Sequence, residues 1–170
     1  MAACALVASS SAALANSAEF RHLTIPAASC VPSGTPAQNA LGKWTVGSWD
    51  LSRNGTFKLT CALPVATGSL TDFRISYRDP DGRTGNASVK ALLVRAKVPP
   101  LYGPGNTTYL DCDFLSNKQG TTTGSFTHQV VACPHPIEAD AFYFFEIELW
   151  RRAAAGDAGN YVAFVGLDFP

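Results

Sequence analysis

The sequence predicts an all-β fold, a single β-sandwich of about eight mostly antiparallel strands of Greek-key or jelly-roll type. Two observations lead to it. Apolar and polar residues alternate in segment after segment, which is the period of a half-buried strand. Turn-forming residues separate these segments at roughly the 8–12-residue spacing typical of sandwiches. Charged residues make up 15% of the chain, below the usual ~25%, which suits half-buried strands better than a helical bundle.

The N-terminal end has the composition of an export signal. Residues 1–15 are small and apolar, and they end in Ala13-Leu14-Ala15, the form of a signal-peptidase site. The usual basic start is missing, so the signal is truncated or the segment is a disordered tail. We expect export to a secreted or periplasmic location, with no transmembrane segment. The organisation is then a signal peptide (1–15), an extended lead-in (16–41) and a β-sandwich domain (42–170).

Eight segments are the predicted strands. Alternation is clearest in "GTFKLTCAL" and "DFRISYRD", where aromatic and aliphatic residues take one parity and Lys, Thr, Arg or Ser take the other. "ASVKALLVRAKV" alternates imperfectly, which predicts a β-bulge. In order, the eight segments are residues 43–50, 55–63, 72–79, 87–98, 107–114, 125–133, 140–152 and 161–169.

Parity also assigns side chains to faces in the later strands. In "TTYLDCDF" the apolar side consists of Leu110, Cys112 and Phe114, and the polar side of Tyr109, Asp111 and Asp113. In the last strand the residues expected to share one side are Tyr161, Ala163, Val165, Leu167 and Phe169.

The cysteines predict two disulfides. If cleavage follows Ala15, Cys4 is removed with the signal and an even number remains, as is typical of exported chains. Three pairings are possible, and the spacing does not choose among them. A zinc site is not expected, because no C-x-x-C spacing is present. The four cysteines are Cys30, Cys61, Cys112 and Cys133.

The segment "DAFYFFEIELWRR", residues 140–152, is the densest aromatic run in the chain. Residues two apart point to the same face of a strand. One parity is fully apolar and must face the core; it consists of Tyr143, Phe145, Ile147 and Leu149. The other parity is mixed and consists of Phe142, Phe144, Glu146, Glu148 and Trp150.

The two glutamates allow two interpretations. Two neighbouring carboxylates could serve glycoside hydrolysis, but catalytic pairs usually face each other from different elements. We expect a cross-strand ladder of charges instead, in which Glu146 and Glu148 pair with Arg74 and Arg78. No catalytic residue is therefore assigned.

The aromatic residues on the mixed face are the candidate ligand-binding residues. If Phe142, Phe144 and Trp150 are exposed beside Glu146 and Glu148, they form a patch that could bind a sugar or a protein partner. The alternative, which we favour, is that a loop or the lead-in covers them.

No cofactor or metal is predicted. Asp79-x-Asp81-Gly82 resembles the beginning of a calcium loop, but the twelfth position is Lys90, a cation. No spacing brings the potential metal ligands Asp111, Asp113, His128 and His135 together. The chain has thirteen basic and thirteen acidic residues and lacks the basic surface that nucleic-acid binding needs.

The order "CVP", "TCALP", "YLDCDF", "VVACP" and a terminal aromatic strand resembles small exported bacterial proteins with no assigned activity. The resemblance covers the chain from about Cys30 onward. It implies a β-sandwich and export, and it adds no site residues.

The leading hypothesis is an exported, non-catalytic β-sandwich that acts as a binding or surface-interaction module of unknown ligand. One alternative is a carbohydrate-active enzyme that uses Glu146 and Glu148. Another is a structural subunit of a homo-oligomer.

Overall fold

The computed structural model describes residues 23–64, 68–82, 85–97, 107–118, 125–152 and 161–170. The predicted signal peptide and Cys4 lie outside these residues. None of the helices in these ranges has the length and apolarity needed to cross a membrane.

Eleven strands and a one-turn helix, α1 (Pro36–Asn39), form the described part of the chain. Two short 3-10 turns, η1 (Ala27–Ser29) and η3 (Ser116–Lys118), complete it. The strands are β1 (Leu23–Pro26), β2 (Val31–Pro32), β3 (Gly42–Thr45), β4 (Ser48–Leu51), β5 (Gly55–Ala62), β6 (Gly68–Arg78), β7 (Ala87–Lys97), β8 (Thr107–Leu115), β9 (Phe126–Ile137), β10 (Ala141–Arg151) and β11 (Val162–Phe169).

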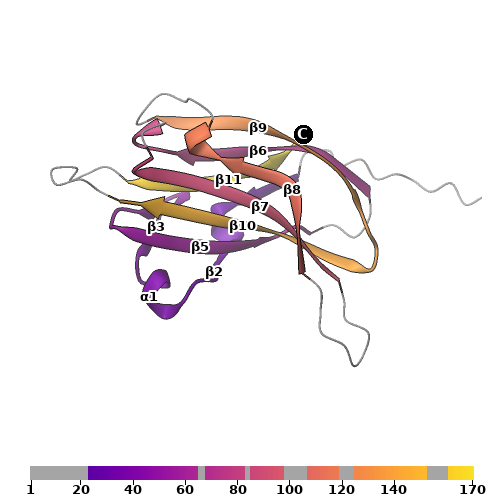
Figure 1. The fold of residues 1–170 in the computed structure, drawn as a ribbon, viewed down its shortest axis with the longest axis horizontal. Coiled ribbons are helices and arrows are strands. Elements are labelled where there is room, and N and C mark those ends of the chain that lie inside the picture. The colour runs from indigo at the N-terminus through magenta and orange to yellow at the C-terminus, as the bar shows by residue number, and fades with distance from the viewer. Residues whose placement is uncertain (1–22, 65–67, 83–84, 98–106, 119–124, 153–160) are drawn as a thin grey trace, which may run out of the picture.

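The strands make two sheets that pack face to face (Figure 1). One sheet has the order β3-β4-β11-β6-β9, with β1 beside β11; the other has the order β2-β5-β10-β7-β8. Every pairing is antiparallel. From β4 to β11, each strand is followed by a strand of the opposite sheet, except that β7 and β8 are neighbours. The chain therefore crosses repeatedly from one sheet to the other.

The predicted all-β sandwich is confirmed, but the count of about eight strands is wrong. Seven of the predicted segments correspond to β5 through β11. The eighth, residues 43–50, is a hairpin of two strands that turns at Val46 and Gly47, where Gly47 has φ 90°. The lead-in contributes β1 to one sheet and β2 to the other.

The core lies between the two sheets and is rich in aromatic rings. Phe145 of β10 contacts Phe73 of β6 with ring centroids 4.8 Å apart, and it contacts Phe169 of β11 at 5.9 Å. Tyr77 of β6 contacts Phe114 of β8 at 5.0 Å. All five side chains are fully buried. Each such side chain contributes about 1.5–3 kcal/mol by leaving water, so these contacts hold the two sheets together.

Two strand pairings contain register shifts. In the pairing of β7 with β8, Leu92 is opposite Asp113 and Val94 is opposite Tyr109, so the extra residues lie in β8. β7 pairs with β10 without a shift, so the prediction of a bulge in residues 87–98 is wrong. A second shift, between Phe164 and Gly166 of β11, was not predicted. Because of it, Phe164 is buried while Val165 is partly exposed. The expectation that Tyr161, Ala163, Val165, Leu167 and Phe169 share one side of the strand is therefore wrong at and before Val165. It holds for Leu167 and Phe169, which are both buried.

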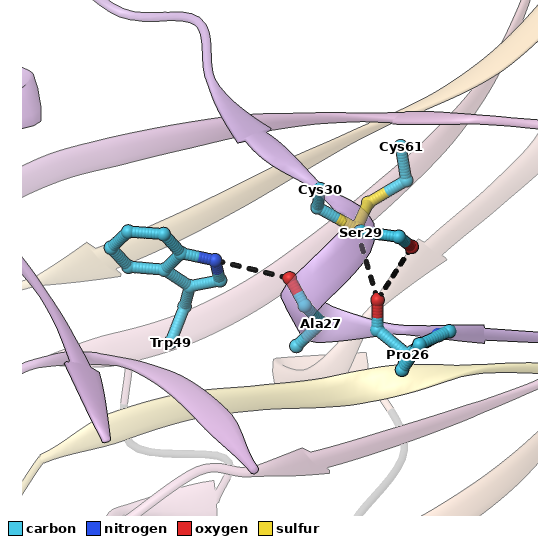
Figure 2. Close-up of a disulfide and its surroundings, with 6 residues drawn as sticks. All are labelled: Pro26, Ala27, Ser29, Cys30, Trp49 and Cys61. Carbon is cyan, nitrogen blue, oxygen red and sulfur yellow. Dashed lines mark hydrogen bonds between the residues drawn. A yellow bond between two sulfur atoms is a disulfide. The ribbon is translucent and has the colours of Figure 1, made fainter. Parts of the chain in front are cut away.

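The disulfides fasten the edges of the sandwich. Cys30, between η1 and β2, is bonded to Cys61 of β5 (Figure 2). Next to this bond the indole Nε1 of Trp49 donates a hydrogen bond to the Ala27 carbonyl oxygen at 3.1 Å. Cys112 of β8 is bonded to Cys133 of β9, so the second disulfide links an edge strand of one sheet to an edge strand of the other. The pairing that the sequence left open is therefore settled.

Peptide mapping under non-reducing conditions should recover Cys30–Cys61 and Cys112–Cys133 as the two linked pairs. A free thiol at Cys61 or Cys112 would contradict the framework.

Replacing Cys112 and Cys133 together by serine should lower the free energy of unfolding by about 2–4 kcal/mol, because the unfolded chain gains freedom. Urea unfolding monitored by tryptophan fluorescence measures this loss.

A carboxyl group is buried where β6 ends. Asp79 is only 2% exposed. It accepts hydrogen bonds from the hydroxyl of Ser116 and, at 3.3 Å, from the backbone N–H of Asp81. Burial raises the pKa of Asp79 to about 6, and the hydrogen bond from Ser116 opposes this shift. The pKa in the folded state is thus above the ordinary value of about 3.9.

A raised carboxyl pKa makes the fold less stable as pH increases. The folded state binds the proton more tightly than the unfolded state, so the stabilisation is complete below about pH 4 and is lost as pH rises through 6. Relative to D79N, the wild-type chain should lose about 1–2 kcal/mol of stability between pH 4 and pH 7. Urea unfolding of both proteins at both pH values tests this, and an equal stability gap at the two pH values would refute it.

Candidate functional site

The outer face of the five-stranded sheet is hollowed near its centre. The hollow has a volume of about 420 Å³, which lies within the ~300–1,000 Å³ typical of ligand sites. Four of its lining residues are charged, one is aromatic and one is aliphatic. They are Lys58, Lys90, Leu92, Tyr109, Glu146 and Glu148.

The strand order places these side chains together. β10 lies between β5 and β7, so each outward residue of β10 has a neighbour on both sides. Glu148 is opposite Lys58 of β5 and Lys90 of β7. Glu146, two residues earlier, is opposite Thr60 and Leu92. The hollow is therefore lined by the outward residues of strands whose alternate residues face the core.

One lysine holds both glutamates. The ammonium Nζ of Lys58 lies 3.1 Å from Oε1 of Glu146 and 3.3 Å from Oε2 of Glu148. The hydrogen bond to Glu146 raises the pKa of Lys58, and Glu148 adds to the effect, while partial burial opposes it. Lys58 therefore remains a cation between two carboxylates.

Glu146 and Glu148 do form cross-strand ion pairs, as predicted. The predicted cationic partners of these glutamates are wrong. Arg74 and Arg78 belong to β6, which lies in the other sheet. Arg78 donates a hydrogen bond to the carbonyl oxygen of Tyr161 and lies 4.1 Å from the centre of the Tyr161 ring. Parity places a side chain on a face but does not identify the neighbouring strand, and here the neighbour is β5 with Lys58.

The remaining residues of the hollow were not identified as site residues from the sequence. Tyr109 is 59% exposed, and parity had already placed it on the polar side of its strand. Lys90 takes part in no ion pair among the described residues. Lys58, Lys90 and Leu92 all occupy outward positions of predicted strands. To identify them, one would have needed to know that β5 and β7 flank β10 and that β8 lies beside β7.

The three predicted aromatic residues lie on the outer face but do not line the hollow. Phe142 is 69% exposed, so the expectation that the chain covers it is wrong. Phe144 and Trp150 are half-buried. The lead-in, which could have covered this face, instead lies along the edge of the sheet, where Val31 is opposite Thr60 of β5.

The histidines considered as metal ligands have other partners. Nδ1 of His128 lies 2.7 Å from the hydroxyl of Ser76, and Nε2 of His135 lies 3.3 Å from the hydroxyl of Tyr143. Within the ranges that the structure describes, no group of three or more His, Cys, Asp or Glu side chains could hold a metal ion.

The hollow combines balanced charge with an exposed ring. Its two lysines and two glutamates sum to a net charge of zero. The glutamates offer acceptors, Lys90 offers donors, and Tyr109 adds an aromatic surface with a hydroxyl group. These groups suit a neutral molecule that has both donors and acceptors.

Replacing Glu146 and Glu148 together by glutamine should change the free energy of unfolding by less than about 1 kcal/mol. The reason is that partly exposed ion pairs contribute little to stability. Urea unfolding of E146Q/E148Q and the wild-type chain provides the comparison. A loss of several kcal/mol would show that the pair supports the fold and is not a surface feature.

Comparison with solved structures yields distant similarities. A structure of the carbohydrate-binding module TmCBM61 with β-1,4-galactotriose has 9% identity and a TM-score of 0.38, with 88% of each chain covered. A structure concerned with carbohydrate-binding modules of the β-sandwich superfamily has 11% identity and a TM-score of 0.44. That match covers 92% of this chain and 59% of the other. The K2 cleaved adhesin domain of Lys-gingipain has 16% identity and a TM-score of 0.37, covering 92% and 94%.

No family model and no curated protein matches the chain. Its function must therefore be inferred from its own side chains.

Proposed function

We propose that this protein is an exported binding module that holds a neutral carbohydrate, without cleaving it, against the outer face of its five-stranded sheet. The observation that carries the proposal is the hollow, in which the exposed ring of Tyr109 lies beside a charge-balanced set of lysines and glutamates.

The chemistry of a sugar ring matches this lining. A pyranose has a face of C–H groups and a rim of hydroxyl groups that both donate and accept hydrogen bonds. The C–H face can pack on the ring of Tyr109, as apolar groups do on aromatic side chains. The hydroxyl groups can donate to Glu146 and Glu148 and accept from Lys90. A small number of polar groups around an apolar contact is the usual composition of a ligand site.

The charges favour a neutral ligand over an ionic one. Lys58 is already shared by two carboxylates, so an anion would have to compete with both of them. A cation would face Lys58 and Lys90. A neutral hydroxylated chain can bond to all four groups and leave the ion pairs in place.

The arrangement of the glutamates disfavours the enzyme alternative. Glycosidases place their two carboxyl groups on either side of the scissile bond, and one of them must carry a proton. Glu146 and Glu148 project from one face of one strand, and the ammonium of Lys58 bridges them. Two carboxyl groups that share one ammonium on the same face do not lie on either side of a bond.

Export is supported by the cysteines. All four cysteines from Cys30 onward are paired in disulfides, and such bonds persist in oxidising compartments. The signal peptide, the bacterial source and a secreted or periplasmic location remain predictions.

A glycan array followed by calorimetry with the strongest neutral hit tests the proposal. We expect Y109A to weaken binding at least tenfold, because it removes the aromatic surface. The matched control is F126A, which removes a similarly exposed ring, 51% exposed, from the outer face of the other sheet. F126A should bind as the wild-type chain does. Equal affinity of Y109A and F126A for the glycan would overturn the proposal. So would a pull-down with the wild-type chain that captures proteins while the array gives no glycan hit.

The same glycan separates binding from catalysis and from self-association. Prolonged incubation with the wild-type chain should release no new reducing ends. Light scattering should give the mass of a monomer for both the wild-type chain and F142A. Hydrolysis that disappears in E146Q/E148Q would establish the enzyme, and a dimer that dissociates in F142A would establish the homo-oligomer.

A further inference from the structure

The outer face of the six-stranded sheet carries a serine and a histidine in direct contact. Ser76 of β6 and His128 of β9 are opposite each other in the antiparallel register. The hydroxyl Oγ of Ser76 lies 2.7 Å from Nδ1 of His128. Both strands are held by their ladder of backbone hydrogen bonds, so the contact is fixed by the sheet. It lies on the opposite side of the sandwich from the proposed carbohydrate site.

This pair opens into a hollow of its own. The hollow has a volume of about 350 Å³. Ser76 is 6% exposed, so little water reaches it, whereas His128 is exposed. The other lining residues are mainly apolar or small. The full lining is Val46, Gly47, Ser48, Ser76, Phe126, His128 and Val165.

A second serine in the same hollow provides an internal comparison. Oγ of Ser48 lies 2.6 Å from Oδ1 of Asp50 and 2.8 Å from the hydroxyl of Thr45. A carboxylate and a hydroxyl therefore hold Ser48, and no imidazole contacts it among the described residues. Ser76 is the serine of this hollow that has a potential general base within hydrogen-bonding distance. A nucleophile and a base in such contact are the signature of an activated nucleophile.

We propose that Ser76 is an acyl-acceptor serine, activated by His128, that reacts with small esters carrying an apolar acyl group. In the tautomer with the proton on Nε2, Nδ1 of His128 accepts the hydroxyl proton of Ser76. Oγ then bonds to the ester carbonyl carbon, the ester C–O bond breaks, and the leaving alkoxide takes the proton from Nδ1 as an alcohol. Water later hydrolyses the acyl-serine by the same route and releases the carboxylic acid.

The apolar lining selects the acyl group. The side chains of Val46, Phe126 and Val165 line the same hollow as the serine. An aliphatic acyl chain would therefore leave water on entering, whereas a charged chain would find no charged partner among these three side chains. In the described residues no carboxylate accepts a hydrogen bond from His128, so the histidine acts without the third member of a catalytic triad. Removing that member from a triad lowers the rate by about 10⁴. We therefore expect slow acylation, visible as a stoichiometric adduct, and not rapid turnover.

An alkyl fluorophosphonate applied to the whole protein tests the proposal. The Ser76 oxygen displaces fluoride from phosphorus, and His128 takes the proton, which leaves a stable adduct that intact mass and peptide mapping locate. We expect one adduct, at Ser76, that is absent in S76A and unchanged in S88A, which removes a serine of similar burial, 8% exposed, from β7 of the other sheet. H128Q should slow labelling at least tenfold, because a positioned base contributes about 10²–10⁴.

The variants must be folded for the result to count, so thermal melting is measured for each. F126K provides a second variant that leaves the dyad in place, and by putting a charge at the rim of the hollow it should also slow labelling. Labelling at Ser76 with equal rates in the wild-type chain, H128Q and F126K would overturn the proposal. So would adducts elsewhere with none at Ser76.

Discussion

The burial of one face of β10 is the constraint on which the rest of the structure depends. Tyr143, Phe145, Ile147 and Leu149 lie in the core between the sheets. Because side chains alternate along a strand, their burial forces Glu146 and Glu148 outward at the centre of the sheet. β5 and β7 then bring Lys58 and Lys90 beside them. The candidate site is thus the outer side of a strand whose inner side lies in the core.

The edges of the sandwich are controlled by covalent bonds and by the lead-in. An open sandwich leaves edge strands with unpaired backbone groups, which must be covered or constrained. The Cys112–Cys133 bond joins β8 to β9, one edge from each sheet. The Cys30–Cys61 bond holds β2 against β5. Both central faces remain open as a result, and the two hollows lie on them, one on each sheet.

Sequence patterns predicted faces better than they predicted neighbours. Period two placed Glu146 and Glu148 outward and Phe145 inward, because parity is a local property of one strand. The pairing of the glutamates with Arg74 and Arg78 was wrong, since which strands lie side by side depends on how the chain crosses between sheets. The shift at Phe164 and Gly166 of β11 was missed for a similar reason: this strand pairs with β6 around the bulge, and its own alternation gives no sign of it.

The sequence by itself determined the all-β class and the inner and outer faces of most strands. It also determined which four cysteines form the two disulfides, but not how they pair. These follow from composition and from the alternation of neighbouring residues. Only the tertiary structure decided which cysteines pair, that Lys58 holds both glutamates, and that Ser76 meets His128. Each of these contacts joins residues at least 21 positions apart. Such pairs are brought together by the order of strands in the sheets, which no local pattern encodes.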